Sequence, residues 1–258
     1  MATVRPMNPN PSPTAAVLII GDEILSGRTP DTNTNTIARF LGALGIDLKE
    51  VRVVGDVEDE IVAALNALRP RYTCVFTTGG IGPTHDDITA DAIAKAFGVG
   101  IDYHPEALAM LATRIKAEDL NVMRKRMARI PFGASLVKNS VSAAPGFQIE
   151  NVFVMAGVPK IMQAMLEDIA PRLARGRVVR AITISAPIGE GSIAVALAKL
   201  QDDHGDVAIG SYPTYREGGG YGVQLVARGR DGDEVEKVAQ AIEQIVRNAG
   251  AEPERQAS

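Results

Sequence analysis

The chain has 258 residues, 46% of them hydrophobic, and a formal net charge of −4. This composition supplies a core for one large or two modest domains, and it excludes both a chain disordered throughout and a protein whose main role is to grip nucleic acid. With 1 Cys and no apolar run near the ~20 residues of a membrane helix, we expect a protein without disulfides or membrane spans in a reducing, cytoplasmic compartment.

Residues 1–14 contain four prolines and no apolar signal-peptide core, so we expect a disordered leader. From residue 15 to about residue 172, predicted strands and helices alternate, which is typical of a parallel sheet wrapped by helices. The predicted strands cover residues 16–20, 51–54, 73–77 and 152–155. One predicted helix starts near Asn35, another starts near His104, and a third spans residues 161–173. Apolar stripes after the second and third strands predict two more helices.

The most informative segment, residues 76–89, reads FTTGGIGPTHDDIT and joins the third predicted strand to a helix. Gly79, Gly80 and Gly82 have no Cβ, so their backbone can turn with its N–H groups bare. Thr89 is the expected N-cap of the helix, which Gly98 should end. Free N–H groups and a helix N-terminus both favour a bound phosphate.

Two acids in this segment, Asp86 and Asp87, would repel a phosphate unless a divalent cation or a protonated donor lay between them and the anion. We therefore predict a phosphate-and-metal pocket in which Asp86 and Asp87 hold the metal. The alternative is a tight strand–helix turn with solvated acids. Asp22 follows the first strand as Asp86 follows the third. Because the carboxyl ends of parallel strands share one edge of the sheet, we expect both acids in one pocket. The alternative for Asp22 is a turn or helix cap.

Other polar residues at this predicted edge are weaker candidates. Thr84 and Asn35 could each bind a nucleotide hydroxyl or phosphate, or each could be a cap. Glu23 and His85 could contact ligand or solvent. A small basic cluster is either a solvated helix face or a wall that contacts ligand phosphates; it comprises Arg124, Lys125, Arg126 and Arg129.

The pattern changes after residues 175–177. A strand (178–185), a helix (192–200), two strands (207–212 and 221–227) around a loop with Gly218, Gly219 and Gly220, and a last amphipathic helix follow in order. This β-α-β-β-α order predicts a small α+β domain over residues 176–250. The tail, 251–258, is predicted to be disordered.

Four segments together resemble the molybdopterin-binding (MoaB/Mog-like) fold, in the form found in the competence/damage-inducible protein A (CinA) family. Residues 76–89 resemble its signature, and residues 20–27 with 33–35 resemble its GDE-Φ-L-x-G and NTN elements. Residues 131–134, Asn139 and 144–147 match its middle block. Residues 156–159 resemble its PGVP turn, with Ala156 where proline is usual.

The resemblance implies an α/β, three-layer MoaB/Mog-like fold over residues 15–172, followed by a KH-like α+β module over 176–250. A KH domain grips nucleic acid through a GxxG loop, whereas this chain has Gly189-Glu190-Gly191-Ser192, so we expect no nucleic-acid partner. The resemblance to the CinA family also implies a homo-oligomer. With the residue reasoning above, it gives catalytic candidates Asp22, Asp86 and Asp87 and substrate-binding candidates Gly21, Glu23, Asn35, Gly79, Gly80, Gly82, Thr84, Gly157 and Pro159.

Two functions follow from the resemblance. The first is a CinA-like pyrophosphohydrolase, an enzyme that cleaves a dinucleotide-type diphosphate of the ADP-ribose or FAD class with Mg²⁺, Mn²⁺ or Co²⁺. The alternative is a protein that binds molybdopterin or a nucleotide for molybdenum cofactor biosynthesis without hydrolysis. The second domain and the Asp86–Asp87 pair favour the hydrolase.

Overall fold

The computed structural model describes residues 12–216 and 220–256, and it divides into two units between Gly176 and Arg177. The predicted leader therefore lies mostly outside the described residues, and Thr14 already belongs to the first strand. The strands of the first unit are β1 (Thr14–Ile20), β2 (Asp47–Val54), β3 (Cys74–Thr78), β4 (Ile101–Tyr103), β5 (Arg129–Pro131), β6 (Ser135–Val137), β7 (Gly146–Ile149) and β8 (Val152–Met155).

Helices follow most of these strands. They are α1 (Asp22–Leu25), α2 (Asn33–Ala43), α3 (Glu58–Leu68), α4 (Thr89–Phe97), α5 (Pro105–Ala112), α6 (Val122–Lys125) and α7 (Pro159–Ile169), with 3₁₀ turns η1 (Ala117–Asp119), η2 (Arg126–Ala128) and η3 (Ala170–Arg172). The main sheet has the order β2-β1-β3-β8-β7-β6. Its first four strands are parallel, whereas β7 and β6 are antiparallel additions that the sequence patterns did not indicate.

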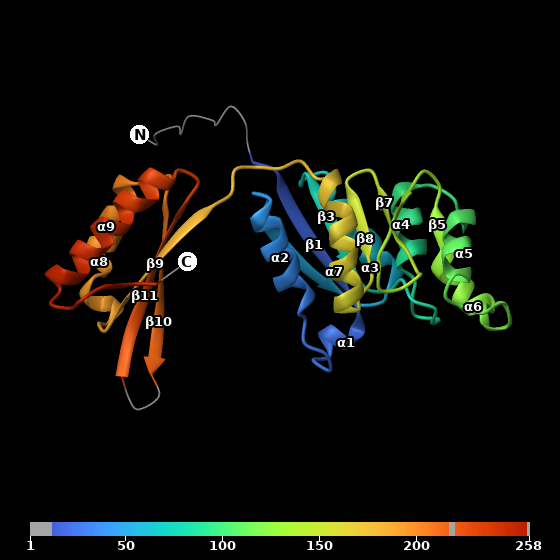
Figure 1. The fold of residues 1–258 in the computed structure, drawn as a ribbon, viewed down its shortest axis with the longest axis horizontal. Coiled ribbons are helices and arrows are strands. Elements are labelled where there is room, and N and C mark those ends of the chain that lie inside the picture. Colours follow the sequence, from blue (N-terminus) through green and yellow to red (C-terminus); the bar gives the residue numbers. More distant parts are fainter. Residues whose placement is uncertain (1–11, 217–219, 257–258) are drawn as a thin grey trace. The chain divides into compact units, whose positions relative to one another are not determined.

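Two hydrophobic cores, one on each face of this sheet, confirm the predicted three-layer α/β fold. Figure 1 shows α2 and α7 on one side of the sheet and α3 and α4 on the other. Along β1, Leu18 and Ile20 pack into one core and Val17 and Ile19 into the other, so the strand is apolar throughout. A parallel strand covered on both faces requires such a continuous apolar run.

Several predicted helix starts differ from the structure by one or two residues. The helix expected from near Asn35 begins at Asn33, because the Asp31 carboxylate accepts the N–H groups of Asn33 and Thr34. Thr89, the expected N-cap of α4, is the first residue of that helix, and its side chain makes a different contact described below. Gly98 ends α4 in the left-handed conformation, as predicted.

The second unit has the predicted β-α-β-β-α order in a small antiparallel α+β fold. It contains β9 (Arg180–Ala186), η4 (Glu190–Ser192), α8 (Ala194–Asp203), β10 (Ala208–Arg216), β11 (Gly220–Gly229), α9 (Gly232–Asn248) and β12 (Glu254–Arg255). The sheet order is β10-β11-β9-β12, and α8 and α9 supply the apolar residues that cover it. Most of the predicted three-glycine loop falls on residues 217–219, outside the described residues.

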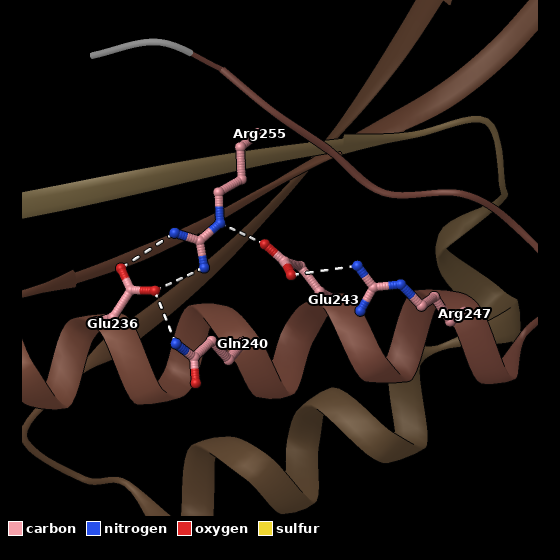
Figure 2. A network of polar contacts seen from close by, with 5 residues as sticks. All are labelled: Glu236, Gln240, Glu243, Arg247 and Arg255. Carbon is pink, nitrogen blue, oxygen red and sulfur yellow. Dashed lines mark hydrogen bonds and ion pairs between the residues drawn. The ribbon is translucent and has the colours of Figure 1, made fainter.

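The prediction of a disordered tail is wrong for residues 254 and 255, because they form β12 and pair with β9. Figure 2 shows the reason: Arg255 forms ion pairs with Glu236 and Glu243 of α9. Gln240 and Arg247 bind the same two carboxylates from neighbouring turns. A short polar tail has no periodic signal of its own, so only the fold reveals that α9 presents acids to Arg255.

The described parts of the chain include no helix with both the length and the apolar character needed to cross a bilayer.

Candidate ligand-binding site

A cavity of about 590 Å³ lies in the first unit, where β3 and β8 end. The turn after β3 (residues 79–83) and the turn after β8 (residues 156–158) both line it. Its apolar wall includes Leu111, Ile115, Met127 and Ile161, and its charged lining residues are Glu23, Asp87 and Arg114. An apolar cavity with a few polar groups at the carboxyl edge of a parallel sheet is the usual form of a small-molecule site.

The glycine turn owes its shape to two positive φ angles, 109° at Gly79 and 65° at Gly80. A Cβ on Gly79 would lie 2.0 Å from the Ile20 carbonyl oxygen, and one on Gly80 would lie 2.2 Å from Thr89 Oγ1. The Thr89 hydroxyl donates to the Gly79 carbonyl at 3.0 Å, and the Thr89 N–H donates to the Gly80 carbonyl at 3.0 Å. Thr89 therefore fastens the turn to α4 instead of capping the helix.

The number of N–H groups free for an anion is smaller than predicted. Within the described residues, the N–H groups of Gly80 and Ile81 have no internal acceptor, but the Gly82 N–H donates to Asp87 Oδ1 at 2.7 Å. A phosphate at this turn would thus meet two free backbone donors, on a loop whose conformation is already fixed.

Asp87 is an internal brace of this loop. Its Oδ2 accepts the Thr84 N–H at 2.7 Å and the Thr84 hydroxyl at 2.5 Å, while Oδ1 accepts the Gly82 N–H. Arg126 donates to the Asp87 backbone carbonyl at 3.2 Å. Because both carboxylate oxygens of Asp87 and the hydroxyl of Thr84 are used within the loop, this geometry argues against the predicted roles of Asp87 in metal binding and Thr84 in ligand binding.

Asp86 has the opposite setting. Its side chain is 60% exposed, and His85 Nδ1 lies 3.8 Å from its Oδ1 on a side chain that is 93% exposed. Hydrogen bonding within the turn lowers the pKa of the Asp86 carboxyl and keeps it charged. Of the predicted acid pair, Asp86 is the one available to a cation.

Asp22 pairs with an acid that the sequence interpretation missed. The Asp22 N–H donates to Asp56 Oδ2 at 2.9 Å, and the Asp56 N–H donates to Asp22 Oδ1 at 3.4 Å. Burial raises the pKa of Asp56, with further contributions from the charges of Asp22, Glu23 and Asp86. Asp56 follows β2 just as Asp22 follows β1, so the rule that selected Asp22 could also have found Asp56.

The predicted site residues therefore separate into two groups. Those that line the cavity are Glu23, Gly79, Gly80, Gly82, Asp87 and Gly157. Gly21, Asp22, Asn35, Thr84, Asp86 and Pro159 do not line it. Gly21 instead joins β1 to β2 through its N–H bond to the Val54 carbonyl, and Pro159 opens α7 at its first turn. Asp22, Glu23, Asp56 and Asp86 form an acidic group beside the cavity, and Glu23 is its member that also lines the cavity.

Asn33, two residues before the predicted Asn35, ties the end of β3 to the turn after β8. Its buried Nδ2 donates to Thr78 Oγ1 at 2.9 Å and to the Gly157 carbonyl at 2.8 Å. Asn35 is exposed on α2. Asn33 shares a helix face with the buried Ile37 and Leu41 at i+4 and i+8, so helical periodicity could have selected it over Asn35.

We expect Asn33→Ala to lower the free energy of unfolding of the first unit by about 1–3 kcal/mol, because the buried Thr78 hydroxyl loses the donor that its oxygen accepts. Ligand affinity should fall as well, since Thr78 and Gly157 support the two turns that line the cavity. Asn35→Ala on the same helix is the control and should leave both quantities nearly unchanged. Urea denaturation of both variants provides the measurement, and equal stabilities would contradict the assigned role of Asn33.

The acidic group has a testable pH signature. Since the folded-state pKa of Asp56 is raised, its carboxyl destabilises the fold progressively as the pH rises above the ordinary value of 3.8 and through the raised value. Asp56→Asn keeps an oxygen acceptor for the Asp22 N–H, so it should stabilise the protein at neutral pH, with a gain that shrinks toward about pH 4.

The control for this prediction is Asp59→Asn, because a hydrogen bond from Lys95 lowers the pKa of Asp59. This substitution should therefore destabilise the protein at neutral pH, and the loss of stability should become larger as the pH rises. Denaturation series over this pH range would compare the two variants, and a stability loss for Asp56→Asn at neutral pH would contradict the acidic-group interpretation.

No three His, Cys, Asp or Glu groups of the described residues are arranged to hold a metal ion. The described residues therefore do not form an all-protein metal cage. Mg²⁺, however, commonly binds through one or two carboxylates together with the phosphates of a ligand. The exposed Asp86 and the Asp22–Asp56 pair suit that second mode, whereas Asp87 does not.

Comparison with known proteins agrees with this architecture. Residues 16–175 match the family described as "Probable molybdopterin binding domain". The chain belongs to this family. Residues 179–254 match a second family, described as "FAD synthase, middle domain".

Relatives of this molybdopterin-binding-domain protein include one from Archaeoglobus fulgidus, 34% identical over 230 residues, covering 89% of this chain and 96% of that protein. Another, from Pyrococcus furiosus, is 34% identical over 241 residues, covering 88% of this chain and 94% of that protein. Among solved structures, the protein CinA of unknown function from Thermoplasma acidophilum is 35% identical, with a TM-score of 0.59, over 62% of this chain and 98% of that one. The predicted resemblance to the CinA family and its MoaB/Mog-like domain is thereby confirmed.

Proposed function

We propose that the first unit binds the phosphate of a nucleotide or pterin at the glycine turn, with the ring in the apolar part of the cavity. The observation that carries this proposal is the pair of free N–H groups on Gly80 and Ile81 at the edge of a cavity of about 590 Å³. The side chains of Leu111, Ile115 and Met127 offer an apolar surface to a flat ring. The family description favours a pterin ligand such as molybdopterin, and the match of the second unit to a FAD synthase domain favours a nucleotide.

We further propose that the bound ligand is a dinucleotide-type diphosphate of the ADP-ribose or FAD class and that the protein hydrolyses it with Mg²⁺, Mn²⁺ or Co²⁺. The acids that follow β1, β2 and β3 support this step, because carboxylates beside a phosphate site raise the affinity for a divalent cation. Asp22 and Asp86 would hold the ion together with the phosphate oxygens. Its chemistry would be to offset phosphate charge and polarise the P–O bonds.

The chain's own groups would orient the ligand. The Gly80 and Ile81 N–H groups would fix one phosphate, and the apolar wall would exclude water from the ring. The brace formed by Asp87, Thr84 and Arg126 would keep the turn in place.

The test is a screen of the purified chain against ADP-ribose, FAD, AMP and a pterin phosphate, each with and without Mg²⁺, Mn²⁺ or Co²⁺. Release of AMP from ADP-ribose or FAD would support the hydrolase. Saturable binding without product would support the alternative, a binding protein of molybdenum cofactor biosynthesis. Absence of binding to all four compounds would exclude both.

The remaining proposals rest on the sequence. We propose a homo-oligomer in the cytoplasm that takes a small-molecule ligand and no nucleic acid. The turn Gly189-Glu190-Gly191-Ser192 supports the last point, because Glu190 puts an acid at the position where a KH loop would meet a phosphate, and its Oε1 accepts from Ser211 at 2.5 Å.

A further inference from the structure

Arg114 is the cation among the residues that line the cavity. Its guanidinium is exposed and donates to the backbone carbonyls of Ser140 at 3.2 Å and Val141 at 3.3 Å. Within the described residues no carboxylate pairs with it, whereas Arg129 forms an ion pair with Asp91 at 2.7 Å. The positive charge of Arg114 at the cavity is therefore not offset.

The loop that Arg114 contacts does not depend on it. Asn139 and Ser142 hold this loop: Asn139 Nδ2 donates to the Ala144 carbonyl, Asn139 Oδ1 accepts the N–H groups of Val141 and Ser142, and the Ser142 hydroxyl bonds to Ala144. Residues 142–144 of the same loop line the cavity. Arg114 can thus leave the two carbonyls without loss of the wall.

A second arginine, Arg126, lies beside the glycine turn. Arg126 borders a smaller hollow that shares Gly80, Ile81 and Gly82 with the main cavity, and it donates to the backbone of Asp87. Arg126 therefore lies beside the turn at which the first phosphate of the ligand is proposed to bind. Arg114, on the segment that follows α5, lines the cavity separately from the turn.

We propose that Arg114 is a specificity-determining residue that binds a second anionic group of the ligand and so favours diphosphates over monophosphates. The inference rests on the proposed function, because it requires a first phosphate at the glycine turn. A guanidinium bonded only to neutral carbonyls gains a shorter, charge-assisted and often bidentate bond when an anion replaces them. Loss of this charge should weaken only those ligands that have the second anion.

The experiment uses the full chain and calorimetric titration with ADP and with AMP. The test variant is Arg114→Gln, which removes the positive charge and keeps a polar side chain. The control is Arg124→Gln: Arg124 lies outside the cavity lining and donates to the Asp119 carbonyl at 2.9 Å. We expect Arg114→Gln to lower the affinity for ADP about tenfold, which is the effect of one charge-assisted contact. The affinity for AMP should fall less than about twofold. The control variant should keep the wild-type affinities for ADP and for AMP and the wild-type melting temperature.

Three outcomes would overturn the inference, and they are distinguishable. Equal weakening of ADP and AMP would show that Arg114 acts through the loop or through overall binding. Unchanged ADP affinity in Arg114→Gln would show that it contacts no ligand anion; in both cases the proposed function stands. If the wild-type chain binds neither nucleotide nor inorganic pyrophosphate, the nucleotide form of the proposed function fails and the inference fails with it, whereas the pterin form is decided by the screen above.

Discussion

Gly79→Ala is expected to destabilise the first unit by about 2–5 kcal/mol and to abolish ligand binding. Two effects add: alanine is strained at a φ of 109°, and its Cβ would lie 2.0 Å from the backbone carbonyl of Ile20. A backbone oxygen of the buried β1 has no rotamer with which to move away. Native-state hydrogen exchange of the β1 and β3 amides measures the loss in this unit alone.

Gly27→Ala is the matched control for that variant. Gly27 also has a positive φ, 71°, but a Cβ there would meet nothing within 4 Å. Its cost should be only the backbone strain, about 1 kcal/mol. If Gly79→Ala were as stable as Gly27→Ala, the tight fit between the glycine turn and the end of β1 would be disproved.

Gly80→Val, by contrast, is a poor test of phosphate approach. The sequence alone suggests that the valine would stand where the phosphate must come. The structure directs a Cβ at Gly80 toward Thr89 Oγ1, at 2.2 Å, so the variant would break the turn itself. Any loss of binding would then report folding of the loop.

Asp86→Asn is expected to lower the rate of diphosphate cleavage about 10²-fold, the usual loss when one preorganised electrostatic group is removed from a catalytic site. Stability should change little, because the Asp86 side chain is 60% exposed and serves no buried partner. The rate of AMP release from ADP-ribose and the melting temperature, measured on the same preparation, test both parts.

Asp87→Asn separates function from structure at the neighbouring position. An amide cannot accept from Gly82 on one side and from Thr84 on the other, so the brace is lost, at a cost of about 1–3 kcal/mol. We expect its loop to loosen and its affinity for ligand to fall together. A wild-type rate in Asp86→Asn combined with a lower melting temperature would reverse the two roles and remove Asp86 from the site.

The acid pair illustrates what residue order cannot reveal. Adjacent in sequence, Asp86 and Asp87 look equivalent, and both were predicted to hold a metal. The turn places the Asp87 carboxylate against its own N–H donors and leaves that of Asp86 in solvent. Which of two neighbouring side chains points inward depends on the φ and ψ angles of the loop, and the loop is held by the hydrogen bonds of Asp87 and Thr89.

The sequence by itself determined the three-layer fold, the small α+β unit and the place of the glycine turn. These depend on local signals: a strand buried on both faces must be apolar throughout, as β1 is, and Gly98 is suited to end α4. Only the tertiary structure decided that Asp22 and Asp56 exchange hydrogen bonds, that Asn33 joins Thr78 to Gly157, and that Arg255 fastens the tail to α9. Each of these contacts joins residues far apart in the chain, and its formation depends on how whole strands and helices pack, which no local pattern encodes.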